Sequence, residues 1–199
     1  MSMSADTKHA WFGPWVDTYL QAIGLTLAKI RSPEKFLELI AAEPRPGDQP
    51  GGVLALADES TLSQALIGAV LVPGGPGWIL GAESPSCVCY WKAGRLSAAG
   101  GMTVALHYTE DSGGRFHWAS NGVTIAEFSL TDGADAGIDG SDPQRLLQAL
   151  RTAGLGTDGT TDPCTAALAL FEVITGTVVT RRILEGHFTV GSVSDPYSQ

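Results

Sequence analysis

The dipeptide Asn121-Gly122 lies between two runs in which apolar and polar residues alternate, RFHWAS and VTIAEF. Asn and Gly readily adopt the positive φ angles of a two-residue type I′ turn, so this pattern predicts a β-hairpin. A turn of this length also fixes the register of the strands that it joins. It places Trp118 opposite Ile125 and Phe116 opposite Glu127.

The chain from residue 53 to residue 130 consists of short apolar runs separated by turn residues, such as WILGAE, CVCYW and MTVALHY. Runs of this length and spacing are typical of an antiparallel meander. We therefore expect a sheet region over residues 53–130, with consecutive antiparallel strands over residues 78–130. For residues 53–76 the pattern leaves strand and helix open.

The segments before the sheet region have a different pattern. Residues 15–42 are predicted to form two helices, because apolar residues recur there at helical spacing and Ser32-Pro33 is a typical helix start. Residues 43–52 contain three prolines and three glycines, which predicts a linker. Residues 1–14 are expected to be a flexible tail.

Residues 141–190 return to a helical pattern. Asp142 and Asp162 are each followed by proline, which predicts the starts of two helices, and a short helix is expected from Thr180. Helices, then strands, then helices are the order expected of an α+β fold. We predict an antiparallel β-meander sheet flanked by N-terminal and C-terminal helices, in a single domain over residues 15–199.

The charge and the cysteine content limit the compartment and the partners. The chain has 21 acidic residues against 12 lysines and arginines, a formal net charge of -9, which disfavours binding to nucleic acid. No apolar run reaches the roughly 18 residues of a membrane span, and the N-terminus lacks the pattern of a secretory signal. The three cysteines are interpreted as free thiols, so a cytoplasmic location is expected.

Two histidines form the most chemically suggestive part of the sequence. If the turn before the hairpin is centred near Ser112, His107 lies opposite His117. Alternation then places both histidines and Arg115 on a polar face of the sheet, with Trp118 on the core face. Two histidines whose Cβ atoms lie about 5 Å apart can share a metal ion, but a stable site needs a third and usually a fourth ligand. Since the usual zinc spacings are absent, we predict no metal and no cofactor.

Glu127 falls on the core face in this register. A carboxyl group buried among aromatic residues would have a raised pKa and could serve as a general acid. Alternatively, Glu127 lies at the margin of the sheet and reaches solvent. The candidate catalytic residues are therefore His107, His117, Arg115 and Glu127.

Three aromatic residues cluster near the N-terminus between polar residues: Trp11, Phe12 and Trp15. Such a cluster either packs back onto the body of the protein or marks a surface that a partner binds. We treat these residues as candidate binding residues.

Several segments of the chain together resemble a family of small actinobacterial proteins of unknown function. The matching segments occur in order from Tyr19 onward and include YLQAIGLTLAKIRSPEKFLELI, GWILGAE, GRLSAAG, RFHWASNG, DPQRLLQALRTAGL, AALALFEVITGTVVT and FTVGSV. The resemblance implies one small cytoplasmic module. It implies no activity and no catalytic residues.

Two functions are compatible with these observations. The first is a small acidic interaction module that docks on another protein, as an accessory or immunity-like protein, by analogy with acidic inhibitors of basic toxins. The alternative is a small cofactor-free enzyme, tailoring or hydrolytic, that uses the polar sheet face with His107, His117 and Arg115. A pocket lined by these three residues would favour the enzyme, and a flat, solvated face would favour the interaction module.

Overall fold

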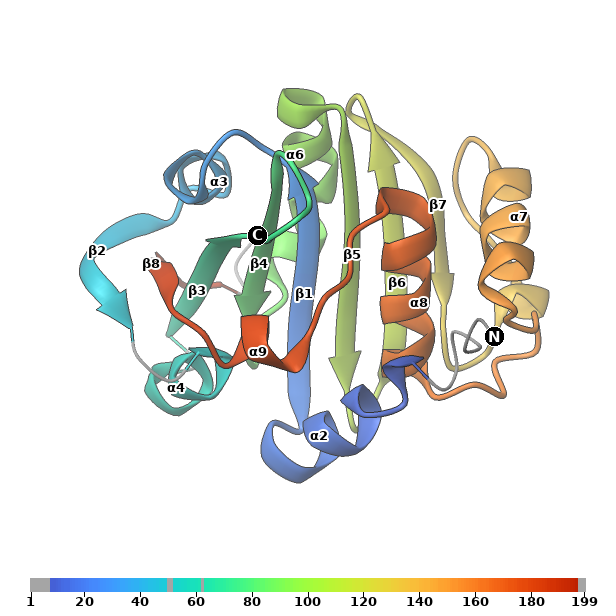
Figure 1. Cartoon of the computed structure of the whole chain (residues 1–199), viewed down its shortest axis with the longest axis horizontal. Coiled ribbons are helices and arrows are strands. Elements are labelled where there is room, and N and C mark those ends of the chain that lie inside the picture. Colours follow the sequence, from blue (N-terminus) through green and yellow to red (C-terminus); the bar gives the residue numbers. More distant parts are fainter. Residues whose placement is uncertain (1–7, 50–51, 62, 197–199) are drawn as a thin grey trace.

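The strands in the described residues form one antiparallel sheet, in the order β2-β8-β3-β4-β1-β5-β6-β7 (Figure 1). The structure is a computed structural model that describes residues 8–49, 52–61 and 63–196. The strands are β1 (Ala22–Lys29), β2 (Glu43–Gln49), β3 (Gln64–Leu71), β4 (Trp78–Glu83), β5 (Met102–Thr109), β6 (Gly113–Ser120), β7 (Val123–Ser129) and β8 (Phe188–Ser194).

Helices cover both faces of this sheet (Figure 1). The α8 face carries α2 (Phe12–Tyr19), α4 (Gly52–Glu59), α7 (Pro143–Ala153), α8 (Pro163–Thr175) and α9 (Arg181–Leu184). The α6 face carries α3 (Pro33–Leu39), α5 (Val88–Trp91) and α6 (Ala93–Gly100). Each face buries its own apolar cluster. The predicted α+β class, an antiparallel sheet flanked by helices, is confirmed.

The prediction of helices throughout residues 15–42 was wrong at its centre. α2 and α3 are helical, but Ala22–Lys29 between them forms β1, which lies between β4 and β5. Both faces of β1 are buried, so its sequence lacks the alternation that marks a half-exposed strand. Ile23 and Leu27 fit the spacing of a helix face, yet in β1 they point to one side together with Leu25.

The predicted linker over residues 43–52 was also wrong. Glu43–Gln49 forms β2, which pairs with β8 at the edge of the sheet. Its register shifts between Pro44 and Asp48. An edge strand with such an irregularity tolerates prolines, because one side of its backbone needs no ladder partner.

Three helices interrupt the expected sheet region over residues 53–130. Residues 53–76, which the sequence left open, contribute most of α4 and the whole of β3, and α5 and α6 occupy most of 88–100. CVCYW and GRLSAAG were interpreted as strands because short apolar runs do not distinguish a strand from a buried helix. The C-terminal region 141–190 contains the expected helices, but from Phe188 onward it forms β8.

Both predicted aspartate caps are confirmed. Asp142 Oδ1 accepts a hydrogen bond from the backbone N–H of Arg145 (3.3 Å), and Asp162 Oδ1 accepts one from Thr165 (2.7 Å). Each cap satisfies a backbone donor that the first turn of the helix leaves unpaired. Within the described residues, no helix combines the length and the apolar character that crossing a bilayer requires.

Candidate functional site

The hairpin at Asn121-Gly122 is confirmed, but its register differs from the predicted one. Both turn residues have positive φ angles, 49° and 84°. A β-bulge between Trp118 and Ala119 changes the pairing, so that Trp118 lies opposite Ala126 rather than Ile125. A bulge adds one residue to one strand and therefore reverses the faces of all residues beyond it.

Glu127 consequently lies on the polar face. Phe116 pairs with Phe128, and His117 pairs with Glu127. The prediction that Glu127 lies on the core face opposite Phe116 was wrong.

The predicted pairing of the two histidines was wrong as well. His107 lies opposite Arg115, and His117 lies opposite Ala105. A shift of two residues preserves the face, so both histidines still point to the α6 face. The ring of Tyr90, in α5, contacts both of them, with centroid distances of 6.1 Å to His107 and 5.5 Å to His117.

Tyr90, His107, Arg115, His117 and Glu127 form one group of side chains, the Tyr90 cluster. Tyr90 Oη donates a hydrogen bond to Glu127 Oε1 (2.8 Å), and Arg115 Nη2 donates one to the same oxygen (2.8 Å). Burial alone would raise the pKa of Glu127, but these two donors hold it below its ordinary value of 4.5. Glu127 is therefore a paired carboxylate at neutral pH. With its side chain 22% exposed, it is closer to the second alternative from the sequence, a residue that reaches solvent, than to a buried general acid.

The histidines of the Tyr90 cluster are neutral at neutral pH. Burial lowers the pKa of His117, and burial together with the Arg115 charge lowers the pKa of His107. His117 Nε2 lies 3.1 Å from Thr124 Oγ1. In the part of the chain that the structure describes, neither histidine has a hydrogen-bonded carboxylate to orient it for acid–base catalysis.

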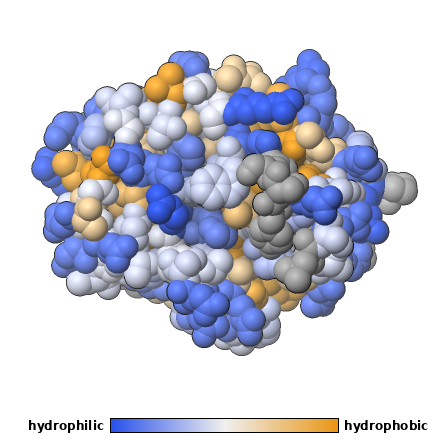
Figure 2. Space-filling view, turned by 180° about the vertical axis from the view of Figure 1, so that it is seen from behind, coloured by the Kyte–Doolittle hydropathy of each residue, from blue (hydrophilic) through white to orange (hydrophobic). Residues whose placement is uncertain are grey.

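The same residues do not make a metal site. Among the described residues, no group of three or more histidine, cysteine or acidic side chains is arranged to hold a metal ion. The α6 face is mainly hydrophilic, with hydrophobic residues scattered over it (Figure 2).

Replacing His117 with alanine is expected to lower the free energy of unfolding by about 1–2 kcal/mol, because the change removes the contact with Tyr90 and the hydrogen bond to Thr124. The sequence alone predicted an exposed residue and a change of no more than about 0.5 kcal/mol. Burial holds the folded-state pKa below the ordinary value of 6.5. His117 therefore stabilises the fold above about pH 6.5, and this contribution is lost as the pH falls through the folded-state pKa.

Urea titrations of wild type and variant at about pH 7.5 and about pH 5 measure both effects. The difference between the two proteins should shrink at the lower pH. The control replaces the exposed His187 with alanine, and the free energy of unfolding of this variant should stay close to that of wild type at both pH values. A His117 variant as stable as wild type at both pH values would contradict the prediction.

The three N-terminal aromatic residues do not form an exposed surface. Phe12 is fully buried and Trp15 nearly so, while Trp11 is partly buried against the same core. The predicted tail over residues 1–14 is wrong for residues 8–14: Lys8 and the buried His9 contact Glu172 of α8, and α2 begins at Phe12. Residues 1–7 lie outside the described part of the chain. Of the two interpretations of this cluster, the structure supports packing onto the body.

Glu83, which sequence reasoning did not select, is fully buried at the end of β4. It accepts hydrogen bonds from the backbone N–H groups of Val88 (2.9 Å) and Cys89 (2.8 Å) and from the hydroxyl of Ser86. The carboxylate lies over Gly24, where an added Cβ would be 2.7 Å from Glu83 Cγ. Glu83 thus fixes the start of α5, which carries Tyr90. The sequence signal that could have identified Glu83 is a single acidic residue at the end of the apolar run WILGAE.

Two touching loops carry exposed aspartates that lack ion-pair partners among the described residues. Asp132, Asp135 and Asp139 come from the connection between β7 and α7, and Asp158 comes from the connection between α7 and α8. The loops touch at Gly133, where an added Cβ would be 2.6 Å from the carbonyl carbon of Asp158. We call these four residues the acidic patch. Within the described residues none of them takes part in an ion pair.

The fold and these sites define an α+β protein whose half-buried Tyr90 cluster is internally hydrogen-bonded and whose acidic patch lies exposed on two touching loops. The chain belongs to a family of unknown function (DUF6461), whose model matches residues 1–197. The resemblance to a family without an assigned activity is thereby confirmed. No curated protein and no solved structure matches the chain significantly.

Proposed function

We propose that this protein is a non-catalytic interaction module that docks on a basic protein through the acidic patch, as an accessory or immunity-like protein. The observation that carries the proposal is that two touching loops carry four exposed aspartates without ion-pair partners in the described residues. Unpaired carboxylates at a surface attract a cationic partner and accelerate its association. The net charge of -9 acts in the same direction.

The backbone of the acidic patch is held in place before any partner binds. Asp135 N donates to Thr157 O (3.0 Å), which ties the two loops together. Asp139 exchanges two backbone hydrogen bonds with Glu127, of 2.7 and 2.9 Å. A preorganised loop loses little conformational entropy on binding, which supports a docking role over that of a solvated linker.

The alternative, a small enzyme that uses the polar sheet face, has less support. Arg115 and Glu127 are hydrogen-bonded to each other, and Tyr90 shares the same carboxylate oxygen. A catalytic acid or base needs a free proton-transfer position, which this pairing occupies.

A binding experiment with two matched variants tests the proposal. The patch variant carries Asp132→Asn, Asp135→Asn, Asp139→Asn and Asp158→Asn. The control variant loses the same number of charges at exposed positions elsewhere: Glu34→Gln, Asp58→Asn, Glu110→Gln and Asp111→Asn. A protein retained on immobilised wild type from a lysate of the source organism is identified by mass spectrometry, purified and titrated against all three proteins.

We expect a basic partner whose affinity falls at least about tenfold for the patch variant, changes little for the control variant and declines with rising salt. An equal loss in both variants, a partner that is not basic, or no retained partner would contradict the proposal.

We also propose that the protein is actinobacterial and resides in the cytoplasm. The support is the resemblance described above and the three cysteines, all of which are free thiols. Cell fractionation with an antibody against the chain tests the location.

A further inference from the structure

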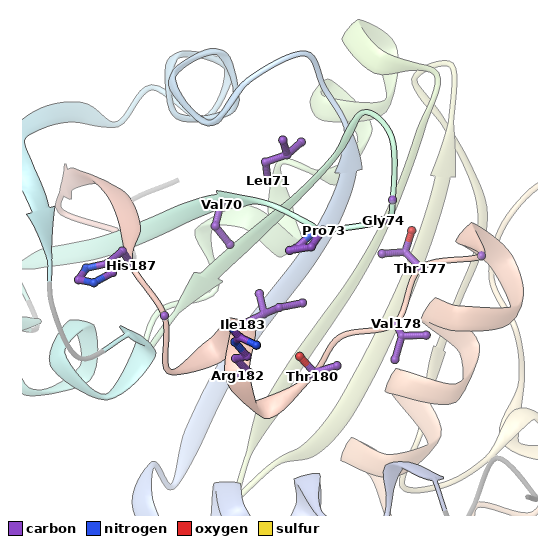
Figure 3. A pocket seen from close by; sticks show the side chains of 13 residues that line it. Val70, Leu71, Pro73, Gly74, Thr177, Val178, Thr180, Arg182, Ile183 and His187 are labelled. Carbon is purple, nitrogen blue, oxygen red and sulfur yellow. The ribbon is translucent and has the colours of Figure 1, made fainter.

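A cavity of about 610 Å³ lies on the α8 face, between the turn that joins β3 to β4 and the segment that joins α8 to α9 (Figure 3). Its walls include the apolar side chains of Val70, Pro73, Val178 and Ile183. Cavities of about 300–1,000 Å³ with mainly apolar walls are typical of sites for small molecules. None of the Tyr90 cluster or of the acidic patch lines it.

Arg182 places a positive charge at the rim of this cavity (Figure 3). The neighbouring Arg181 is paired with Glu185, with its Nε 2.6 Å from Oε1. Arg182 has no ion-pair partner among the described residues. In an acidic protein an unpaired guanidinium beside an apolar cavity is a specific position for a carboxylate, which it can bind through two parallel hydrogen bonds.

Thr177, which also lines the cavity, has a buried side chain with a hydroxyl that is unsatisfied among the described residues. It is 3% exposed, and its hydroxyl has no hydrogen-bond partner in the described part of the chain. The turn approaches it closely, since a Cβ added at Gly75 would lie 2.9 Å from Thr177 Oγ1. A buried hydroxyl without a partner costs free energy, and a ligand atom that hydrogen-bonds it, after a small shift of the covering turn at Gly75, would recover this cost.

We propose that this cavity binds a small organic monocarboxylate with an apolar body and a second oxygen atom distant from the carboxylate. The carboxylate pairs with Arg182, the apolar body contacts the walls formed by Val70, Val178 and Ile183, and the second oxygen hydrogen-bonds Thr177. The site is separate from the acidic patch, so the patch variant described above should bind the same ligands as wild type.

Calorimetric titration with defined acids tests this proposal. The probes are hexanoate, octanoate and decanoate, their ω-hydroxy derivatives, and octanol and octylamine as compounds of the wrong charge. We expect at least one acid to bind wild type, and its ω-hydroxy derivative to bind more tightly. Octanol and octylamine should bind at least about tenfold more weakly, which is the effect of a lost charged hydrogen bond.

Three variants separate the contributions of Arg182 and Thr177. Arg182→Gln should weaken binding of the acid at least about tenfold, whereas Arg181→Gln, the matched control, should leave it within about twofold. Thr177→Val keeps the shape of the side chain and should abolish the advantage of the ω-hydroxy group. Its unfolding midpoint should be unchanged or higher, because the variant removes a buried hydroxyl that lacks a partner.

The proposal is overturned if none of the acids binds, if octylamine binds as tightly as octanoate, or if Arg182→Gln and Arg181→Gln have equal effects. An ω-hydroxy advantage that persists in Thr177→Val would overturn the role of Thr177.

Discussion

Replacing Glu83 with alanine is expected to lower the free energy of unfolding by about 3–5 kcal/mol. The change leaves the backbone N–H groups of Val88 and Cys89 and the hydroxyl of Ser86 without their acceptor in a fully buried position. Each buried donor left without a partner costs about 1–3 kcal/mol, and rotation of the serine hydroxyl recovers part of this. Urea titration measures the loss, and Glu110→Ala, at an exposed carboxylate, is the control.

A second variant, Glu83→Gln, isolates the effect of the charge. Burial raises the folded-state pKa of Glu83 above its ordinary value of 4.5, so ionisation of this carboxyl opposes folding. Its contribution to stability is fully present below about pH 4.5 and is lost as the pH rises through the folded-state pKa. Relative to Glu83→Gln, wild type should therefore be more stable at about pH 4 than at about pH 7. A pH-independent difference, or an alanine variant as stable as the control, would contradict this assignment.

Replacing Phe12 with alanine is expected to cost about 3–5 kcal/mol, the usual cost of truncating a buried phenylalanine. Phe12 is fully buried, and its ring lies 6.1 Å from that of Trp15. A residue in a flexible tail, as the sequence suggested, would cost nothing measurable.

Tyr19→Ala is the matched control, since Tyr19 lies in the same helix with 56% of its surface exposed. It should change the free energy of unfolding by less than about 1 kcal/mol. Equal effects of the two substitutions in a denaturant titration would show that α2 does not depend on Phe12 for its packing.

Local signals predicted the ends of elements well, because the residues concerned act within a few positions of themselves. Asn121-Gly122 adopts the turn that it predicts, and Asp142 and Asp162 accept the hydrogen bonds of the first turns that follow them. The predicted order of helices, strands and helices was sufficient for the α+β class.

The register beyond the hairpin could not be predicted from the same signals. The bulge beside Trp118 decides which face Glu127 occupies, and the turn itself does not encode it. As a result the sequence selected four side chains that the structure brings together, His107, His117, Arg115 and Glu127, but placed the carboxylate on the wrong face of the sheet. Tyr90, which hydrogen-bonds Glu127 and contacts both histidines, was missed because its segment was taken for a strand.

The sequence by itself determined the turns, the helix caps, the acidic charge and the division into helical ends and a sheet region, since these depend on the conformational and electrostatic preferences of neighbouring residues. Only the tertiary structure decided that Ala22–Lys29 is a strand inside the sheet and that Glu43–Gln49 is a strand at its edge. Only the tertiary structure also brought Asp158 beside the loop of residues 131–139, and Arg182 to the rim of the cavity beside Val70. The physical reason is that burial and strand pairing join residues far apart in the chain, and their free energies outweigh the weak local preference of an ambiguous apolar run.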